Sequence, residues 1–124
     1  MKRAVIFMIS MGTIGLGYAK PFNPILGETF QAYIDNCPLY MEQTSHHPPI
    51  STLYFKGRGY EIYGSVNPAI SLRINSVKCF SEAPFYMKFE NKDSIEFRPA
   101  KMLVGGLLVG ERTFDFCDAS NFIL

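Results

Sequence analysis

The chain has 124 residues, of which 48% are hydrophobic, 15% aromatic and 19% charged, and its formal net charge is +1 at pH 7. This length suits one domain, and the composition provides enough apolar side chains for a packed core, which excludes wholesale disorder. The sequence has no long basic run, so a general nucleic-acid binder, which usually presents a basic face, is not expected.

The N-terminal segment allows two interpretations. Two basic residues precede the apolar stretch 4–16, and residues 17–19 resemble a small-residue cleavage site, a pattern typical of a secretory signal peptide. In the alternative, the segment belongs to the domain and forms a short helix over residues 3–11, followed by an extended or irregular stretch over residues 12–18. Its glycines and hydroxyl side chains make it a poor membrane span.

The rest of the chain is typical of short antiparallel strands. Alternating apolar residues and regularly spaced turn residues predict strands at 28–34, 39–43, 50–55, 60–66, 70–74, 85–90, 94–98, 101–109 and 113–117. Turns are expected at 35–38, 56–59, 67–68 and 110–112. The predicted fold class is therefore mainly β, with a partial antiparallel β-barrel or strongly curved sheet and a short N-terminal hydrophobic segment, in one domain over residues 1–124.

The cysteines do not suggest a disulfide framework. The chain has three cysteines, an odd number, and no two of them have CxxC spacing. They are Cys37, Cys79 and Cys117. We therefore expect reduced, mostly buried thiols.

Both histidines of the chain, His46 and His47, stand side by side in the stretch EQTSHHPP, residues 42–49. Adjacent side chains of a regular strand point to opposite faces, so both rings can serve one ligand only where the backbone bends. The two prolines that follow provide such a departure, because they cannot donate to a strand ladder. A histidine cation beside a phosphate would form charge-assisted hydrogen bonds worth roughly 1.5–3 kcal/mol each.

The residues alone leave other interpretations of the pair open. In one of them, the histidines merely cap a turn. A metal site is a weaker alternative, because no third and fourth ligands stand at a recognisable spacing. Nucleophilic catalysis by Ser45 with a neighbouring histidine is weaker still, because adjacent residues seldom align for proton transfer and no GxSxG element is present.

A second candidate is the pentapeptide KPFNP, residues 20–24. Its two prolines form a rigid turn that holds the amine of Lys20 near the amide of Asn23, and both groups can donate to phosphate or hydroxyl oxygens. In the alternative, the turn only separates two segments and Lys20 is solvated.

Together the two stretches resemble the lipid-binding domain of the oxysterol-binding protein family. The family elements KPxNPxLGE and EQxSHHPP stand intact as residues 20–28 and 42–49. Weaker similarity continues through residues 103–107 to about Phe116, so the resemblance covers most of the chain.

The resemblance implies an incomplete form of a nearly closed β-barrel around an apolar tunnel. Such proteins carry a sterol or another lipid through the cytosol, many in exchange for phosphatidylinositol 4-phosphate, with transient peripheral contact to intracellular membranes. The residues implied to bind the phosphoinositide headgroup are Lys20, Asn23, His46 and His47. Neither a cofactor nor enzymatic activity is expected. The family also packs a hydrophobic segment inside the domain before the KPxNP turn, so residues 4–16 are expected to be domain structure.

The chain is much shorter than a complete domain of this family. The family's N-terminal lid and C-terminal region have no counterpart in it, so we expect a partial domain, either a fragment or a divergent half-domain. The alternative function is a degenerate interaction module of the same fold that transfers no lipid and pairs an exposed strand edge with another chain. An esterase or phosphatase that uses His46 as acid or base has little support.

Overall fold

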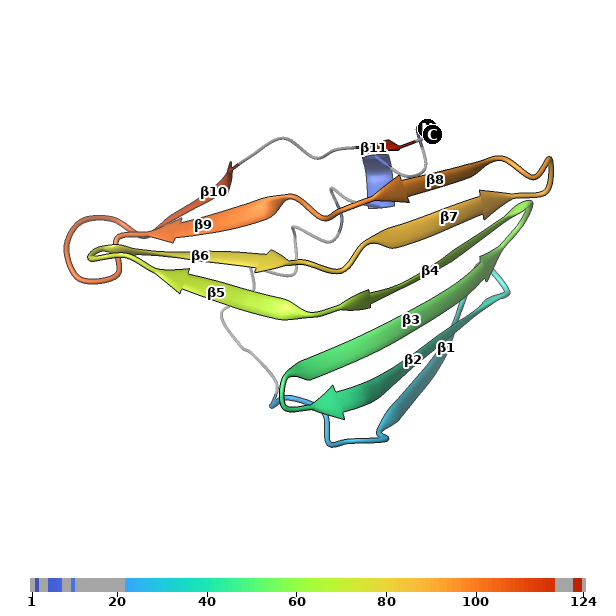
Figure 1. The fold of residues 1–124 in the computed structure, drawn as a ribbon, viewed down its shortest axis with the longest axis horizontal. Helices are drawn as coiled ribbons and strands as arrows, with labels where there is room; N and C mark the ends of the chain where they lie inside the picture. Colours follow the sequence, from blue (N-terminus) through green and yellow to red (C-terminus); the bar gives the residue numbers. More distant parts are fainter. Residues whose placement is uncertain (1, 3–4, 8–9, 11–21, 118–121, 124) are drawn as a thin grey trace.

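The structure is a computed structural model that describes residues 2, 5–7, 10, 22–117 and 122–123. These residues form two antiparallel sheets, one of seven strands in the order β1-β2-β3-β4-β7-β8-β11 and one of four in the order β10-β9-β6-β5 (Figure 1). The strands are β1 (Thr29–Ile34), β2 (Cys37–His46), β3 (Pro49–Gly57), β4 (Tyr60–Val66), β5 (Pro68–Leu72), β6 (Ser76–Ser81), β7 (Phe85–Phe89), β8 (Ser94–Phe97), β9 (Lys101–Gly105), β10 (Thr113–Cys117) and β11 (Phe122–Ile123).

The two sheets are parts of one bent ribbon. In Figure 1, β4 runs on into β5 and β6 runs on into β7 without a reversal of the chain. Gly64 pairs with Phe85 in the first sheet, and Pro68 pairs with Ser81 in the second. The chain advances by four residues from Gly64 to Pro68, and the partner strand also advances by four residues, from Ser81 to Phe85. The register is therefore continuous across the break between the two sheets, and side chains keep the same alternation on both sides of it.

Prolines mark the line of this bend. Pro68 begins β5, Pro84 immediately precedes β7, and Pro99 lies between β8 and β9. A proline has no N–H group to donate to a strand ladder, so the ladder is interrupted at each position. The predicted turn at residues 67–68 is therefore wrong, because the chain bends there and continues in the same direction.

The predicted fold class is confirmed as mainly antiparallel β, and the two sheets do not close into a barrel. The predicted strand 60–66 has the observed bounds, whereas β2 extends to His46 and the predicted strands 70–74 and 101–109 end earlier, at Leu72 and Gly105. The sequence analysis missed β6, because Lys78 and Phe80 share one face of it and disturb the alternation, and it also missed the two-residue β11.

One face of the seven-stranded sheet, which we call the inner face, carries the core. Its buried residues are Ile62, Phe85, Met87, Ile95 and Phe97. Cross-strand pairing places them side by side, since Ile62 pairs with Met87 and Met87 pairs with Ile95.

The N-terminal segment packs on this core. Residues 5–7 and 10 are helical, which confirms the predicted helix at those positions, while the rest of residues 3–11 and the stretch 12–18 lie outside the described residues. The ring of Phe7 stands edge-on, with its centroid 5.7 Å from that of Phe85 and 6.0 Å from that of Phe97. The expected packing of the hydrophobic segment inside the domain is thus confirmed for Phe7.

The opposite, outer face carries a transverse row of tyrosines. Tyr40, Tyr54, Tyr63 and Tyr86 are paired across β2, β3, β4 and β7. The first two rings stack at a centroid distance of 6.5 Å and the last two at 5.3 Å. Desolvation and, after it, the charge and hydrogen bond of Glu61 raise the pKa of Tyr54 above 10.0.

Two further expectations concern the whole chain. In the part that the structure describes, no helix is long and apolar enough to cross a membrane. Cys37, Cys79 and Cys117 are free thiols, but each is half-buried rather than mostly buried. Cys79 and Cys117 belong to the four-stranded sheet, in which Val104 is the buried hydrophobic residue among those described.

Candidate functional site

The two sequence motifs meet at Gln43 of β2. The backbone N–H of Gly27 donates to the carbonyl of Gln43 at 2.8 Å, and the N–H of Gln43 donates to the carbonyl of Glu28 at 3.0 Å. Gly27 has a φ of 78°, a conformation that glycine adopts without a steric cost. The end of the KPFNPILGE stretch is therefore anchored to β2, three positions before His46.

The side chain of Gln43 is buried, with only 2% of its surface exposed. Its amide nitrogen donates to the carbonyl of Ser45 at 2.9 Å, and its amide oxygen accepts a hydrogen bond from the hydroxyl of Ser51. A buried amide left without partners would cost about 1–3 kcal/mol, so these two contacts hold Gln43 in one orientation. Gln43 thereby joins the KPFNPILGE stretch, β2 and β3.

A β-bulge then changes the direction of His46. The pairing of β2 with β3 shifts by one residue after Gln43, at Thr44, and beyond the shift His46 pairs with Pro49. Paired residues share a face and successive residues alternate, so the extra residue places His46 on the inner face with Gln43. Regular alternation from Tyr40 would have placed it on the outer face.

The two imidazoles converge at the turn that follows β2. His46 ends the strand and His47 begins the turn, which contains a cis peptide bond between His47 and Pro48. The ring centroids of the two histidines lie 4.6 Å apart at an interplanar angle of 60°, and both residues are exposed. The two rings therefore contact each other on the exposed surface of the turn.

The other two candidate residues are less well defined by the structure. Asn23 is exposed and stands four positions before the anchored Gly27. Lys20 lies outside the described residues. The structure thus brings His46 and His47 together and attaches the stretch that contains Asn23 to the same strand.

An apolar cavity lies between the N-terminal helix and the inner face. Its volume is about 330 Å³. Its walls include Ile6, Phe7, Ile34, Leu39, Leu53 and Ile62. The sequence analysis assigned no role to these residues, because the common face of Leu53 and Ile62 follows from the register between β3 and β4.

The inner face continues onto the four-stranded sheet, where Val104 in the central strands is buried but the edge strands are largely exposed. Two transverse rows of paired residues lie on this side, Leu72–Val77–Val104–Phe114 and Ile70–Cys79–Met102–Phe116. Ile70, Leu72 and Phe116 are 66%, 74% and 61% exposed. A continuous apolar surface of this kind usually marks a binding site or an interface.

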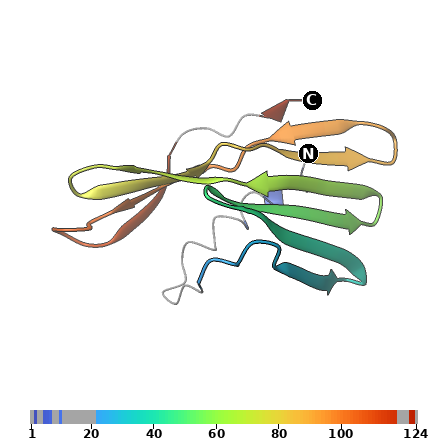
Figure 2. The same cartoon turned by 60° about the horizontal axis from the view of Figure 1, so that its bottom comes forward.

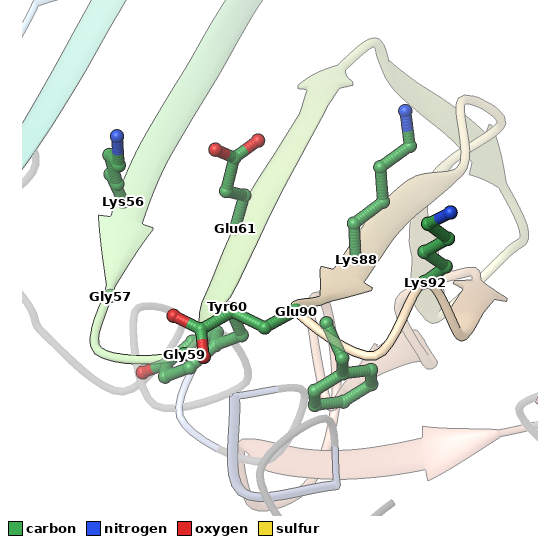
Figure 3. A pocket seen from close by; sticks show the side chains of 9 residues that line it. Lys56, Gly57, Gly59, Tyr60, Glu61, Lys88, Glu90 and Lys92 are labelled. Atoms are coloured by element: carbon green, nitrogen blue, oxygen red, sulfur yellow. The ribbon is translucent and has the colours of Figure 1, made fainter.

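A larger hollow of about 540 Å³ lies at the C-terminal end of β3, far along the strand from the histidine turn. Unlike the apolar cavity, it is lined by several charged side chains. Lys56, Glu61 and Lys88 are neighbours in one cross-strand row, and Figure 3 shows their side chains projecting from the same side of the sheet. Glu90 and Lys92 lie at its rim. Tyr60 and Phe89 also line this hollow, so charged side chains of both signs surround a partly aromatic floor, in contrast to the apolar walls of the first cavity.

A metal centre finds no support in the described part of the chain. No group of three or more His, Cys, Asp or Glu side chains lies close enough there to hold a metal ion.

A family model described as Oxysterol-binding protein matches residues 1–123. The chain belongs to the oxysterol-binding protein family. Oxysterol-binding protein 9 of Dictyostelium discoideum is 36% identical over 125 residues, which cover 98% of this chain and 29% of that protein. Oxysterol-binding protein-related protein 1 of Homo sapiens is 31% identical over 97 residues, which cover 74% of this chain and 10% of that protein. The chain thus spans less than a third of the length of these family members.

Solved structures show the same fold. The Osh1 ORD domain in complex with ergosterol superposes with a TM-score of 0.83 at 24% identity, covering 97% of this chain and 31% of that chain. The Osh3 ORD of Saccharomyces cerevisiae in complex with PI(4)P superposes with a TM-score of 0.78 at 24% identity, covering 94% and 31% of the two chains. The bent ribbon therefore corresponds to about a third of an ORD.

Proposed function

We propose that the protein binds a lipid along its inner face and takes part in non-vesicular lipid transfer. The observation that carries this proposal is the polarity of that face. The histidine turn and the buried Gln43 lie at one end of the face. Apolar side chains line the cavity and form the two transverse rows of the four-stranded sheet. A lipid has the same division between a polar headgroup and an apolar body.

The proposed headgroup site consists of Lys20, Asn23, His46 and His47, with phosphatidylinositol 4-phosphate as the ligand. The convergence of the two imidazoles at 4.6 Å supports it, because a phosphate monoester can accept a hydrogen bond from each ring. The attachment of the KPFNPILGE stretch to Gln43 supports it further, since it ties the segment that carries Asn23 to the strand that carries His46.

The proposed apolar ligand is a sterol or another lipid, exchanged for phosphatidylinositol 4-phosphate during peripheral contact with membranes on the cytoplasmic side. Burial of each methylene group contributes about 0.8 kcal/mol, so the open rows of the four-stranded sheet favour a long apolar ligand. The complexes of related ORD structures with ergosterol, cholesterol and PI(4)P support this ligand class. We also propose that residues 1–124 act as a partial domain, whose tunnel is completed by further structure.

Sedimentation with vesicles tests the headgroup site. We expect phosphatidylinositol 4-phosphate in the vesicles to increase binding of the chain, and the double variant His46→Ala/His47→Ala to lose this increase. The matched control is Lys56→Ala/Lys92→Ala, which removes two charges at the other end of β3 and should retain it. Equal binding by the unchanged chain and the histidine variant would reject the site.

Extraction of a fluorescent sterol from the same vesicles tests the transfer function. The alternative of a non-transferring interaction module makes the opposite prediction, namely a stable dimer by light scattering and no extractable lipid. The open edges of β5 and β10 in the four-stranded sheet are where such a dimer would pair.

A further inference from the structure

Three exposed aliphatic side chains gather at the tip of the four-stranded sheet. Ile74 is 92% exposed, Leu108 75% and Val109 76%. They belong to the turn between β5 and β6 and to the loop between β9 and β10, and Figures 1 and 2 show both connections projecting beyond the rest of the ribbon. Single exposed aliphatic residues are common, but a protruding group of three is not explained by the core or by the inner face.

Asn75 joins the two connections into one ordered tip. Its side-chain nitrogen donates to the carbonyl of Val109 at 2.7 Å, and its side-chain oxygen accepts the N–H groups of Leu108 at 2.8 Å and Val109 at 3.0 Å. Its backbone carbonyl also accepts the N–H of Leu107 at 3.2 Å. Three backbone N–H groups and one carbonyl of the loop are thus hydrogen-bonded to Asn75, while the three aliphatic side chains are exposed.

This combination fits a lipid bilayer better than a protein partner. A partner chain can supply hydrogen-bonding groups to a loop, whereas the apolar part of a bilayer cannot, so a segment that enters it must satisfy its own backbone. Arg73 and Arg112 flank the aliphatic residues and are exposed, with Glu111 as the one opposing charge among the tip residues 73–75 and 107–112. Basic residues beside an apolar group favour the anionic headgroup layer.

We propose that the tip inserts Ile74, Leu108 and Val109 into the interfacial layer of a membrane, as a docking contact separate from the headgroup site. This goes beyond the proposed lipid-binding function, because the contact needs neither the histidines nor a lipid on the inner face. It assigns a role to residues that the family motifs do not include.

Tryptophan fluorescence measures the insertion directly, because the chain contains no tryptophan. The probe is a vesicle of phosphatidylcholine with a minor fraction of phosphatidylserine, without sterol or phosphoinositide. We expect the emission of Ile74→Trp to shift to the blue and to be quenched by lipids with brominated acyl chains. The matched control is Tyr33→Trp, at a residue of β1 that is 75% exposed, and it should show neither change.

Substitution at the tip measures its contribution to binding. We expect Ile74→Asp/Leu108→Asp to weaken partition into these vesicles roughly tenfold or more, because each carboxylate resists transfer into an apolar layer. Tyr33→Asp, which adds a charge at an equally exposed site, should leave the partition unchanged, and circular dichroism checks that each variant is folded. Asn75→Ala retains the aliphatic residues but releases the loop, and should weaken partition several-fold.

The two proposed sites fail in distinguishable ways. The tip variants should still bind soluble inositol 4-phosphate, whereas His46→Ala/His47→Ala should lose that ligand and retain partition into vesicles without phosphoinositide. The tip proposal is overturned if Ile74→Trp shows no lipid quenching, or if its emission shifts with protein concentration in the absence of vesicles, which would indicate self-association. Equal partition of the double aspartate variant and the unchanged chain would also overturn it.

Discussion

The seven-stranded and four-stranded sheets are two parts of one bent ribbon, yet among the described residues the cluster of buried apolar side chains lies in the first. Phe85 in β7 is fully buried beneath Phe7, whereas Phe114 in β10 is 41% exposed. Both residues lie in rows of paired apolar side chains. The two regions therefore differ in the layer above the sheet, and not in the pattern of the strands.

This difference shows on which part of the inner face a bound ligand would bury the most exposed apolar surface. The N-terminal helix covers the inner face at the seven-stranded sheet and leaves a cavity of about 330 Å³ beside it. In the four-stranded sheet, the edge residues of the apolar rows, Ile70, Leu72, Phe114 and Phe116, remain exposed, so they stabilise the folded state less than the buried Val104 between them does.

The strongest test of the comparison is a matched truncation in each sheet. We expect Phe85→Ala to lower the free energy of unfolding by about 3–5 kcal/mol, because it leaves a cavity in a packed core. Phe114→Ala should cost less than about 1 kcal/mol in the absence of lipid, because its ring is already partly solvated. Urea denaturation measures both. Equal costs would show that the four-stranded sheet is covered in solution.

A smaller effect is expected at the junction between the polar and apolar parts of the inner face. Gln43→Ala leaves the hydroxyl of Ser51 without its acceptor and should cost about 1–3 kcal/mol. It should also weaken binding of phosphatidylinositol 4-phosphate, because the bulge before His46 loses its support.

The matched control for Gln43 is Gln31→Ala, at an exposed position of β1, where the change in stability should stay within about 0.5 kcal/mol. A Gln43 variant that is as stable as this control and binds the lipid equally well would contradict the bracing role.

The smallest effect concerns the outer face and appears only in alkali. The pKa of Tyr54 is raised by desolvation and by Glu61, so the folded state holds this proton more tightly than the unfolded state. The resulting stabilisation is complete below the ordinary tyrosine pKa of 10.0 and is lost as the pH rises through the raised value. Ultraviolet absorbance of tyrosinate should show a late-titrating group that moves toward 10.0 in Glu61→Gln. An unchanged titration in that variant would remove Glu61 as a cause.

Several elements of the fold follow from local sequence. The turn between β1 and β2 uses Asp35 and Asn36, with φ values of 51° and 61°, and these residue types tolerate the left-handed conformation that a two-residue hairpin needs. The strand 60–66 was predicted with its observed bounds because a glycine turn precedes it and Pro68 interrupts the ladder after it. In contrast, no local signal marked the bulge at Thr44, since it depends on how β2 pairs with β3.

The candidate site also has features that the local sequence predicted and features that it did not. The motifs identified His46 and His47, and their proximity to each other follows from their adjacency and from the prolines after them. Neither the bracing by Gln43 nor the tip held by Asn75 was predicted, because each joins segments that are far apart in the chain.

The sequence by itself determined the family, the alternation of the strands and the two motifs, because these depend on residue types and short spacings. Only the tertiary structure decided that the strands bend along a line of prolines, that the bulge turns His46 to the inner face, and that, among the described residues, the edge strands of the four-stranded sheet keep that face exposed. The physical reason is that strand register and the covering of a sheet depend on contacts between distant segments, which short spacings do not record.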